Sequence, residues 1–330
     1  MSRTGYLKRL YNPAIFQGDL SREGYFEGWY FKHVSHDASE VMSFIPGVSL
    51  ADEKMAFVQF IDGKRGKTTF YKYPIGEFSA DPERFELRVG PNRFSERGIE
   101  LDLEGEGAPI KGRFEYGHFT RYPRSLLAPG IMGWYSYIPV MECYHGVVSV
   151  THAARGAVSV NGKNYDFGEG RGYIEKDWGV SFPERWIWMQ ANSFSGSDAS
   201  VMLSVAKIPW RGRFFSGFLC FLYAGGEFYR FMTYNRSRIE ALRVDGGILR
   251  ACLANARYAI SIEVKAEGHG KLLAPKTGRM ERIIKESIDA TASVELRDRA
   301  GTLVFRGESP RAGFEDVGDM AGLWEAEGGR

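Results

Sequence analysis

The sequence predicts an all-β fold made of two β-barrel or β-sandwich domains. Apolar and alternating segments recur between turn residues at spacings of about 8–12 residues, a rhythm typical of sandwiches and barrels. Aromatic residues make up 14% of the 330-residue chain and glycine occurs 40 times, which suits short strands and tight turns. Two β-rich halves of similar length flank the middle of the chain. We therefore expect an N-terminal domain over residues 1–165 and a C-terminal domain over residues 166–330, with an approximate boundary.

Strand patterns fill the first half of the chain up to a proline-rich segment. Apolar or alternating runs occupy residues 25–34, 41–50, 55–62, 67–74 and 112–120. Residues 121–139 contain three prolines and little alternation. We expect a long loop there, with a short helix at 124–128.

The same rhythm resumes in the second half. Residues 146–167 show a hairpin pattern in which Asn161 and Gly162 supply the turn. Glycine pairs at 224–226 and 245–247 predict two further hairpin tips. Only the tail, residues 309–325, favours a short helix.

Charge, cysteine content and motifs argue against several classes of protein. The 43 basic and 41 acidic residues nearly balance, so the composition indicates neither nucleic-acid binding nor attraction to an anionic membrane. Cys143, Cys220 and Cys252 form no CxxC pair, which disfavours a zinc knuckle or a disulfide framework and favours a reducing compartment. The usual nucleotide-binding, esterase and zinc-protease motifs do not occur. Without the apolar core of a signal peptide at the N-terminus, we expect a cytoplasmic protein.

One stretch, GYIEKDWGVSFPERWIWMQANSF at residues 172–194, combines acids, indoles and amides. Side chains alternate between the two faces of a strand. A strand over 172–178 therefore places Tyr173, Glu175 and Asp177 on one face and Ile174, Lys176 and Trp178 on the other. Pairing of the two acids with Lys176, Arg185 or backbone amides is the alternative to a functional role.

The second part of this stretch carries a mixed face of its own. A strand over 186–194 places Ile187, Met189 and Ala191 on an apolar face that suits a core. The opposite face resembles the wall of a ligand pocket, apolar in body with a few polar groups; it carries Trp186, Trp188, Gln190, Asn192 and Phe194. Core packing or a domain interface would also explain the two indoles, and buried backbone groups would explain the amides.

A second group lies near the start of the chain, in YFEGWYFKHV at residues 25–34. There Glu27, Trp29 and Phe31 share one face of a strand, and Tyr30 and Lys32 share the other. An edge or closing strand of the first domain is the alternative explanation.

The histidines give a weak signal. His145 and His152 are seven residues apart, so in a continuous strand they point to opposite faces, which disfavours a shared metal site. Either can carry a proton near neutral pH, although a structural role is the more common one for such residues.

The stretch from Glu175 to Phe194 resembles the signature of the tocopherol cyclase family, EKNWG-x-x-FP-x-x-W-x-W-x-Q-x-N-x-F. GWYFK at 28–32 and LLAPKTGRM at 272–280 resemble two further family segments, and the three matches span most of the chain. The resemblance implies a two-domain lipocalin-like β architecture similar to that of carotenoid hydratases. It also implies closure of a chromanol ring on a prenylated hydroquinone, without metal or nucleotide, by protonation of an alkene and attack of the phenol on the tertiary cation.

This chemistry assigns roles to the residues quoted above. A carboxylic acid in an apolar pocket keeps its proton because burial disfavours the charged form. Glu175 is the first candidate for the proton donor, Asp177 the second and Glu27 a distant third. Indole faces shield and stabilise a cation, and amides position the phenol oxygens. The expected substrate-binding residues are Trp29, Tyr173, Trp178, Trp186, Trp188, Gln190 and Asn192.

The match is incomplete at two places. The chain has Asp177 where the cyclases usually carry asparagine, which adds a second acid or marks a different reaction, such as hydration. Residues 123–137 lack the expected family stretch, so we expect the substrate entrance to differ.

The expected partner is a hydrophobic small molecule. Transient contact with a membrane is compatible with such a partner. A lipid- or isoprenoid-binding protein without catalysis and a hydratase are the alternatives, and the oligomeric state is open.

Overall fold

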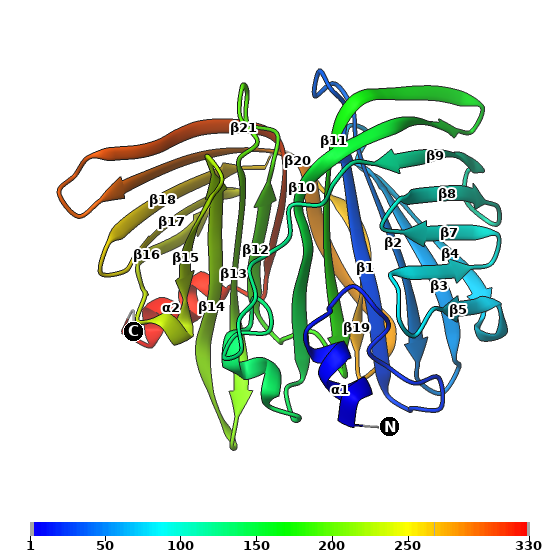
Figure 1. Ribbon diagram of the computed structural model, residues 1–330, viewed down its shortest axis with the longest axis horizontal. Coiled ribbons are helices and arrows are strands. Elements are labelled where there is room, and N and C mark those ends of the chain that lie inside the picture. Colours follow the sequence, from blue (N-terminus) through cyan, green and yellow to red (C-terminus); the bar gives the residue numbers. More distant parts are fainter. Residues whose placement is uncertain (1–2, 267, 329–330) are drawn as a thin grey trace. The chain divides into compact units, whose positions relative to one another are not determined.

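The structure, a computed structural model, describes residues 3–266 and 268–328, and its regular secondary structure consists mainly of antiparallel strands (Figure 1). The chain forms two compact units. The first contains the chain up to Phe182 together with Leu272–Ile283, and the second contains Pro183–Lys271 and the chain from Ile284 onward. The predicted all-β class with two lipocalin-like units is confirmed.

The first unit is built on an 11-stranded sheet with the order β4-β3-β2-β1-β11-β10-β9-β8-β7-β6-β5. Its strands are β1 (Tyr25–Val34), β2 (Val41–Leu50), β3 (Met55–Asp62), β4 (Lys67–Pro74), β5 (Phe78–Ala80), β6 (Glu86–Val89), β7 (Asn92–Ser95), β8 (Gly98–Leu103), β9 (Ile110–Tyr116), β10 (Cys143–Val160) and β11 (Lys163–Gly179). Short helical elements accompany them: α1 (Arg3–Leu10), η1 (Ile75–Glu77) and η2 (Gly133–Tyr137).

The second unit has its own sheet, with the order β15-β14-β13-β12-β21-β20-β18-β17-β16, and β19 pairs with β20. Its elements are β12 (Trp186–Ala191), β13 (Ser200–Trp210), β14 (Arg213–Ala224), β15 (Glu227–Met232), η3 (Thr233–Asn235), β16 (Arg238–Asp245), β17 (Ile248–Ala254), β18 (Tyr258–Lys265), β19 (Gly270–Lys276), β20 (Arg279–Asp298), β21 (Leu303–Val317) and α2 (Met320–Ala326). Residues 272–283, which belong to the first unit, include most of β19 and the first residues of β20.

Several local predictions are confirmed by these boundaries. Asn161 and Gly162 form the β10–β11 turn, with φ of 50° and 77°. The glycine pairs at 224–226 and 245–247 connect β14 to β15 and β16 to β17. The helix in the tail is α2.

Other local expectations are corrected. The helix expected at 124–128 is a tight turn closed by a bridge between Ser125 and Ala128, and the nearest helical turn is η2. For β1, the alternative of an edge strand is excluded, because β1 lies between β2 and β11. The boundary expected between residues 165 and 166 lies inside β11, whose pairing with β1 and β10 holds it in the first unit.

Residues 272–280, which resemble the third family segment, are held to the rest of the first unit by hydrogen bonds. The Gln59 side chain donates to the Leu273 carbonyl and accepts from the Leu273 amide, each at 2.9 Å. The backbone amide of Phe182 donates to the Pro275 carbonyl at 3.1 Å. These bonds explain why residues 272–283 belong to the first unit although the strands that follow them belong to the second.

A buried ion pair joins β1, β11 and the segment before β1. The Lys176 ammonium contacts the Glu27 carboxylate, and both side chains are fully buried. Lys176 donates to the Ile15 carbonyl at 2.5 Å, while Glu27 accepts from the Gln17 amide at 2.8 Å and from the Tyr25 hydroxyl at 2.5 Å. Burial lowers the pKa of Lys176 to about 8, and the Glu27 carboxylate opposes that shift.

Among residues 3–266 and 268–328, the helices are too short or too polar to cross a lipid bilayer.

The buried pair yields a stability prediction. Replacing Lys176 with Met leaves the Glu27 carboxylate buried without its cation, so we expect the free energy of unfolding to fall by about 3–5 kcal/mol. Urea denaturation followed by circular dichroism measures this loss. Lys72→Met is the control, because the Lys72–Glu53 pair is exposed and such pairs contribute at most about 1 kcal/mol. Equal losses in the two variants would contradict the role of the buried pair.

Candidate active site

Four side chains on β10 and β11 form an acid–histidine cluster, defined here as His145, Tyr173, Glu175 and Asp177. The β10–β11 pairing places His145 opposite Asp177, and the alternation of β11 places Glu175 and Tyr173 on the same face as Asp177. The His145 Nδ1 atom lies 2.9 Å from Asp177 Oδ1, and its Nε2 atom lies 3.6 Å from Glu175 Oε2. The Tyr173 hydroxyl donates a hydrogen bond of 2.6 Å to Glu175 Oε2. A continuous polar chain therefore runs from Tyr173 to Asp177.

The surroundings fix the protonation of two members of the cluster. Burial alone lowers the pKa of His145, but the carboxylates of Asp177 and Glu175 outweigh this effect and raise the pKa to about 9. Burial and the neighbouring Glu175 carboxylate raise the pKa of Tyr173 well above its usual value. At neutral pH the cluster therefore contains an imidazolium and a neutral phenol.

The loop between β9 and β10 supports the strand that carries His145. The backbone amide of His145 donates to the Met132 sulfur at 3.1 Å. The Tyr144 hydroxyl donates to the Ile138 carbonyl at 2.5 Å, and the Tyr144 ring stacks on Trp178 at 5.6 Å between centroids. The position of the loop and the position of the histidine are thus linked.

Trp29 and Trp178, two of the expected substrate-binding residues, do not lie on the face of the acids, as the alternation of the strand predicts for Trp178. Both lie on the opposite face of β1 and β11, where Trp29 belongs to the buried core and Trp178 packs against it. Their rings flank the Lys176 ammonium at 4.4 Å and 5.1 Å, and the Trp29 indole donates to the Ala14 carbonyl at 2.8 Å. Their position indicates a structural role in holding the N-terminal segment. Glu27, the third candidate donor, is the carboxylate of the buried pair on this same face.

The mixed face of residues 186–194 belongs to the second unit. Ile187, Met189 and Ala191 lie in the core of that unit, as their alternation predicts. Trp186, Trp188 and Gln190 are also buried, but on the other face of the strand. The strand ends at Ala191 rather than at residue 194, so the buried Asn192 follows it, and Phe194 joins the core. The acids and these residues thus occupy different compact units.

Two contacts with β21 position the indoles of Trp186 and Trp188. The Trp186 indole donates to the Glu315 carboxylate from the neighbouring strand β21. Trp188 lies against Gly313, where an added Cβ would come within 2.6 Å of the indole ring. A glycine at 313 therefore leaves room for the Trp188 ring beside β21.

Sequence reasoning missed the two partners that complete these faces, His145 and Glu315. A count from the turn at Asn161-Gly162 pairs His145 with Trp178, on the wrong face. Irregularities between Val147 and Ser149 and elsewhere in β10 shift the pairing by one residue, to Asp177. Glu315 carried no signal, because its strand partner Trp188 lies far away in the sequence.

The other two buried histidines of the first unit are structural. His33 Nε2 lies 2.7 Å from the Tyr116 hydroxyl, and His152 Nδ1 lies 2.9 Å from the Ser149 hydroxyl. Burial lowers the pKa of His33 to about 3 and the pKa of His152 well below its usual value. Both rings are neutral at physiological pH, which distinguishes them from His145.

A metal ion is the main alternative occupant of the acid–histidine cluster. His145, Glu175 and Asp177 each offer one ligand atom, and these atoms lie within 4.8 Å of one another. Imidazole and carboxylates are common ligands of divalent transition metals. The charge pairing of His145 with Asp177 explains the same geometry without an ion.

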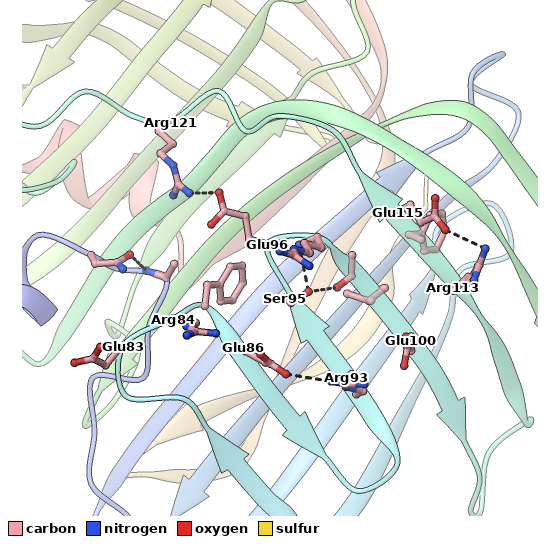
Figure 2. A pocket seen from close by; sticks show the side chains of 17 residues that line it. Glu83, Arg84, Glu86, Arg93, Ser95, Glu96, Glu100, Arg113, Glu115 and Arg121 are labelled. Atoms are coloured by element: carbon pink, nitrogen blue, oxygen red, sulfur yellow. Dashed lines mark hydrogen bonds and ion pairs between the residues drawn. The ribbon is translucent and has the colours of Figure 1, made fainter.

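An open groove of about 660 Å³ lies elsewhere on the first unit, along β6 to β9 (Figure 2). Five arginines and five glutamates line it, and Figure 2 shows Arg93 paired with Glu86, Arg113 with Glu115, and Arg121 with Glu96. No residue of the acid–histidine cluster takes part. A lining this charged does not suit an isoprenoid, which needs an apolar pocket with few polar groups.

Comparison with known proteins identifies the family. A family described as "Tocopherol cyclase-like" matches residues 109–319, which include the acid–histidine cluster and both faces of β12. The chain belongs to the tocopherol cyclase-like family. A tocopherol cyclase of Zea mays is 28% identical over 201 residues, and a probable tocopherol cyclase of rice (Oryza sativa subsp. japonica) is 30% identical over 106 residues.

These relatives are matched only in part. The matches cover 60% and 31% of this chain, but 42% and 23% of the maize and rice proteins. Among solved structures, CghA is similar at a TM-score of 0.57 and 11% identity, with 89% of each chain covered. The likeness to CghA concerns the fold alone. The reaction of the present chain must be argued from its own residues.

The charge state of His145 can be tested directly. We expect the His145 ring to titrate near pH 9 and the Asp177→Asn variant to titrate well below that, because burial then outweighs the remaining carboxylate. Histidine-labelled NMR spectra recorded against pH, with His145→Gln to assign the signal, measure both values. A folded-state pKa above the ordinary 6.5 adds stability that is complete below pH 6.5 and is lost as the pH rises through about 9. An unchanged titration in Asp177→Asn would contradict the pairing.

Proposed function

We propose that this member of the family is a cofactor-independent enzyme that protonates a double bond of a prenylated hydroquinone or related isoprenoid and closes a ring on it. The observation that carries the proposal is the polar chain from Tyr173 through Glu175 and His145 to Asp177. Membership of the family and the fold support it.

Charge balance favours Glu175 as the proton donor. The pair formed by the His145 imidazolium and the Asp177 carboxylate is neutral as a whole. A further ionised carboxylate would leave the buried cluster with a net negative charge, which burial disfavours. Glu175 is only 4% exposed, so we propose that the cluster takes up one further proton at Glu175 before it acts, which leaves Asp177 as the carboxylate paired with His145.

The proposed reaction balances without an oxidant or a reductant. Glu175 gives its proton to an alkene carbon, and the electron pair of the double bond forms the new C–H bond. The phenol oxygen then bonds to the tertiary cation, and the phenolic proton returns to the Glu175 carboxylate. The product is an isomer of the substrate, and the enzyme is restored.

The other members of the cluster keep the donor ready. The Tyr173 hydroxyl donates to Glu175 Oε2 and so orients the carboxyl group. The Asp177 carboxylate holds the His145 ring, whose positive charge stabilises the carboxylate that Glu175 becomes after proton transfer. Trp186, Trp188, Gln190 and Asn192 remain proposed ligand contacts of the second unit, on account of their buried mixed face.

Hydration is the alternative reaction that Asp177 favours, because this carboxylate replaces the asparagine of the family motif. Water would then attack the cation in place of the phenol. Analysis of the product distinguishes an isomer from a hydrate.

The proton donor can be tested with matched variants. We expect Glu175→Gln to lower turnover of a prenylated hydroquinone about 10²–10⁴-fold, the usual contribution of general acid catalysis. Glu169→Gln is the control, since Glu169 lies on the same strand but is exposed and paired with Arg155. Product formation by liquid chromatography, on protein whose fold is checked by circular dichroism, measures the effect.

The outcomes separate the enzyme from a carrier. If Glu175→Gln and Asp177→Asn both retain full turnover, the proposed mechanism is wrong. If wild-type protein binds the hydroquinone without converting it, and Trp186→Ala or Trp188→Ala weakens that binding, the protein is a binding protein. Native mass spectrometry of protein from its own host shows which lipid it carries.

The proposal also predicts independence from metal. We expect dialysis against a chelator to leave turnover unchanged, because the proton comes from a carboxylic acid. Elemental analysis before and after dialysis shows whether an ion was removed. Loss of activity together with one divalent ion per chain, restored by adding that ion, would assign the acid–histidine cluster to a metal.

A further inference from the structure

Large exposed apolar side chains gather in the loop between β9 and β10. Leu126, Leu127 and Val140 are each about four-fifths exposed, at 80%, 79% and 80%, and Trp134 is 44% exposed. Exposed leucines and a tryptophan so close in the sequence cost free energy in water unless another apolar phase receives them.

The N-terminal helix belongs to the same surface. The Tyr11 hydroxyl donates to the Leu126 carbonyl at 3.0 Å and lies 2.7 Å from the Tyr137 hydroxyl. The Tyr11 amide donates to the Leu7 carbonyl at 3.1 Å, and Leu7 is itself 46% exposed. Figure 1 shows α1 and this loop at the same end of the first unit. We name Leu7, Leu126, Leu127, Trp134 and Val140 the apolar loop surface.

The two segments that carry the apolar loop surface are basic in sequence, and the acids nearest to them belong to neighbouring segments: Glu83 pairs with Lys8 and Glu96 pairs with Arg121. Residues 1–18 and 121–141 contain no acidic residue and five basic ones, Arg3, Lys8, Arg9, Arg121 and Arg124, in a chain whose net charge is only +2. Lys8, Arg121 and Arg124 are exposed. Basic side chains around exposed leucines and a tryptophan are typical of segments that lie in the interface of an anionic bilayer.

We propose that the apolar loop surface docks on an anionic lipid bilayer, with Leu126, Leu127 and Trp134 inserted among the headgroups. Phosphate groups of the lipids face the basic residues, and the apolar tips enter the acyl boundary. A second copy of the chain is a poorer occupant, because a symmetric contact would place these basic residues against their own copies.

The docked loop is the one that supports the acid–histidine cluster. Met132 accepts from the His145 amide, and Ile138 accepts from the Tyr144 hydroxyl. Docking therefore brings the strand that carries His145 close to the layer in which a lipophilic molecule dissolves. The docking itself does not depend on the proposed reaction.

Vesicle flotation of the whole protein tests the docking. We expect wild-type protein to float with vesicles of phosphatidylcholine mixed with phosphatidylglycerol, far less with phosphatidylcholine alone, and less as salt is raised. Leu126→Ser together with Leu127→Ser should weaken partitioning at least about tenfold. Lys8→Gln should weaken it about fivefold. The matched control is Leu303→Ser with Val304→Ser, a second pair of adjacent exposed apolar residues, at 45% and 39% exposed.

The outcomes decide the proposal. Loss of flotation in the Leu126→Ser/Leu127→Ser variant but not in the control supports it, provided that circular dichroism shows both variants folded. Equal flotation of both double variants, or no flotation of wild-type protein with either vesicle, overturns it. A wild-type dimer that the Leu126→Ser/Leu127→Ser variant breaks, in the absence of vesicle binding, would assign the surface to self-association instead.

Discussion

The ion pair of Lys176 with Glu27 is the constraint on which the first unit depends, because it fixes the orientation of β11. A slip of one residue in a strand exchanges its two faces. Such a slip would carry Lys176 away from Glu27 and from the carbonyl of Ile15, at the cost of a buried charge without a partner. The same pair therefore determines that Glu175 and Asp177 point to the opposite face, toward His145.

The two faces of β11 carry two different groups of polar side chains, the buried ion pair and the acid–histidine cluster. On one face, Lys176 lies between the rings of Trp29 and Trp178 and joins them to the N-terminal segment. On the other, Glu175 and Asp177 share a histidine whose positive charge they maintain. Alternation in a single strand thus explains why a short motif contains acids, a lysine and indoles side by side, without all of them acting on a ligand.

Much of the fold and part of the site could be predicted from the sequence. Period-two alternation determined the faces of β11 and β12, and glycine-containing turns determined three hairpins, because both signals are local. His145 could not be placed, since a bulge changes which residue lies opposite and no local pattern in β10 reveals it. Trp29 was assigned to the ligand because an indole beside an acid looks the same in a pocket and in a core, and only the strand pairing separates the two.

The net charge of the chain does not reveal where its charges lie. A net charge of +2 indicates no attraction to an anionic surface, yet residues 3–18 and 121–141 carry five basic residues and no acid of their own. A hydrogen bond from Tyr11 to the Leu126 carbonyl joins these two segments, and Lys8 and Arg121 pair with acids from elsewhere, Glu83 and Glu96. Charges that are exposed within a Debye length of one another, about 8–10 Å in physiological salt, act together whatever the net charge of the rest of the chain.

Asp177 also exerts its effect locally, on the charge of its neighbour His145. An asparagine there would remove the ion pair of His145, burial would then favour the neutral ring, and Glu175 would lose the positive charge beside it. The departure of this chain from the family motif therefore changes the charge state of the histidine, while Glu175, the proposed proton donor, is retained.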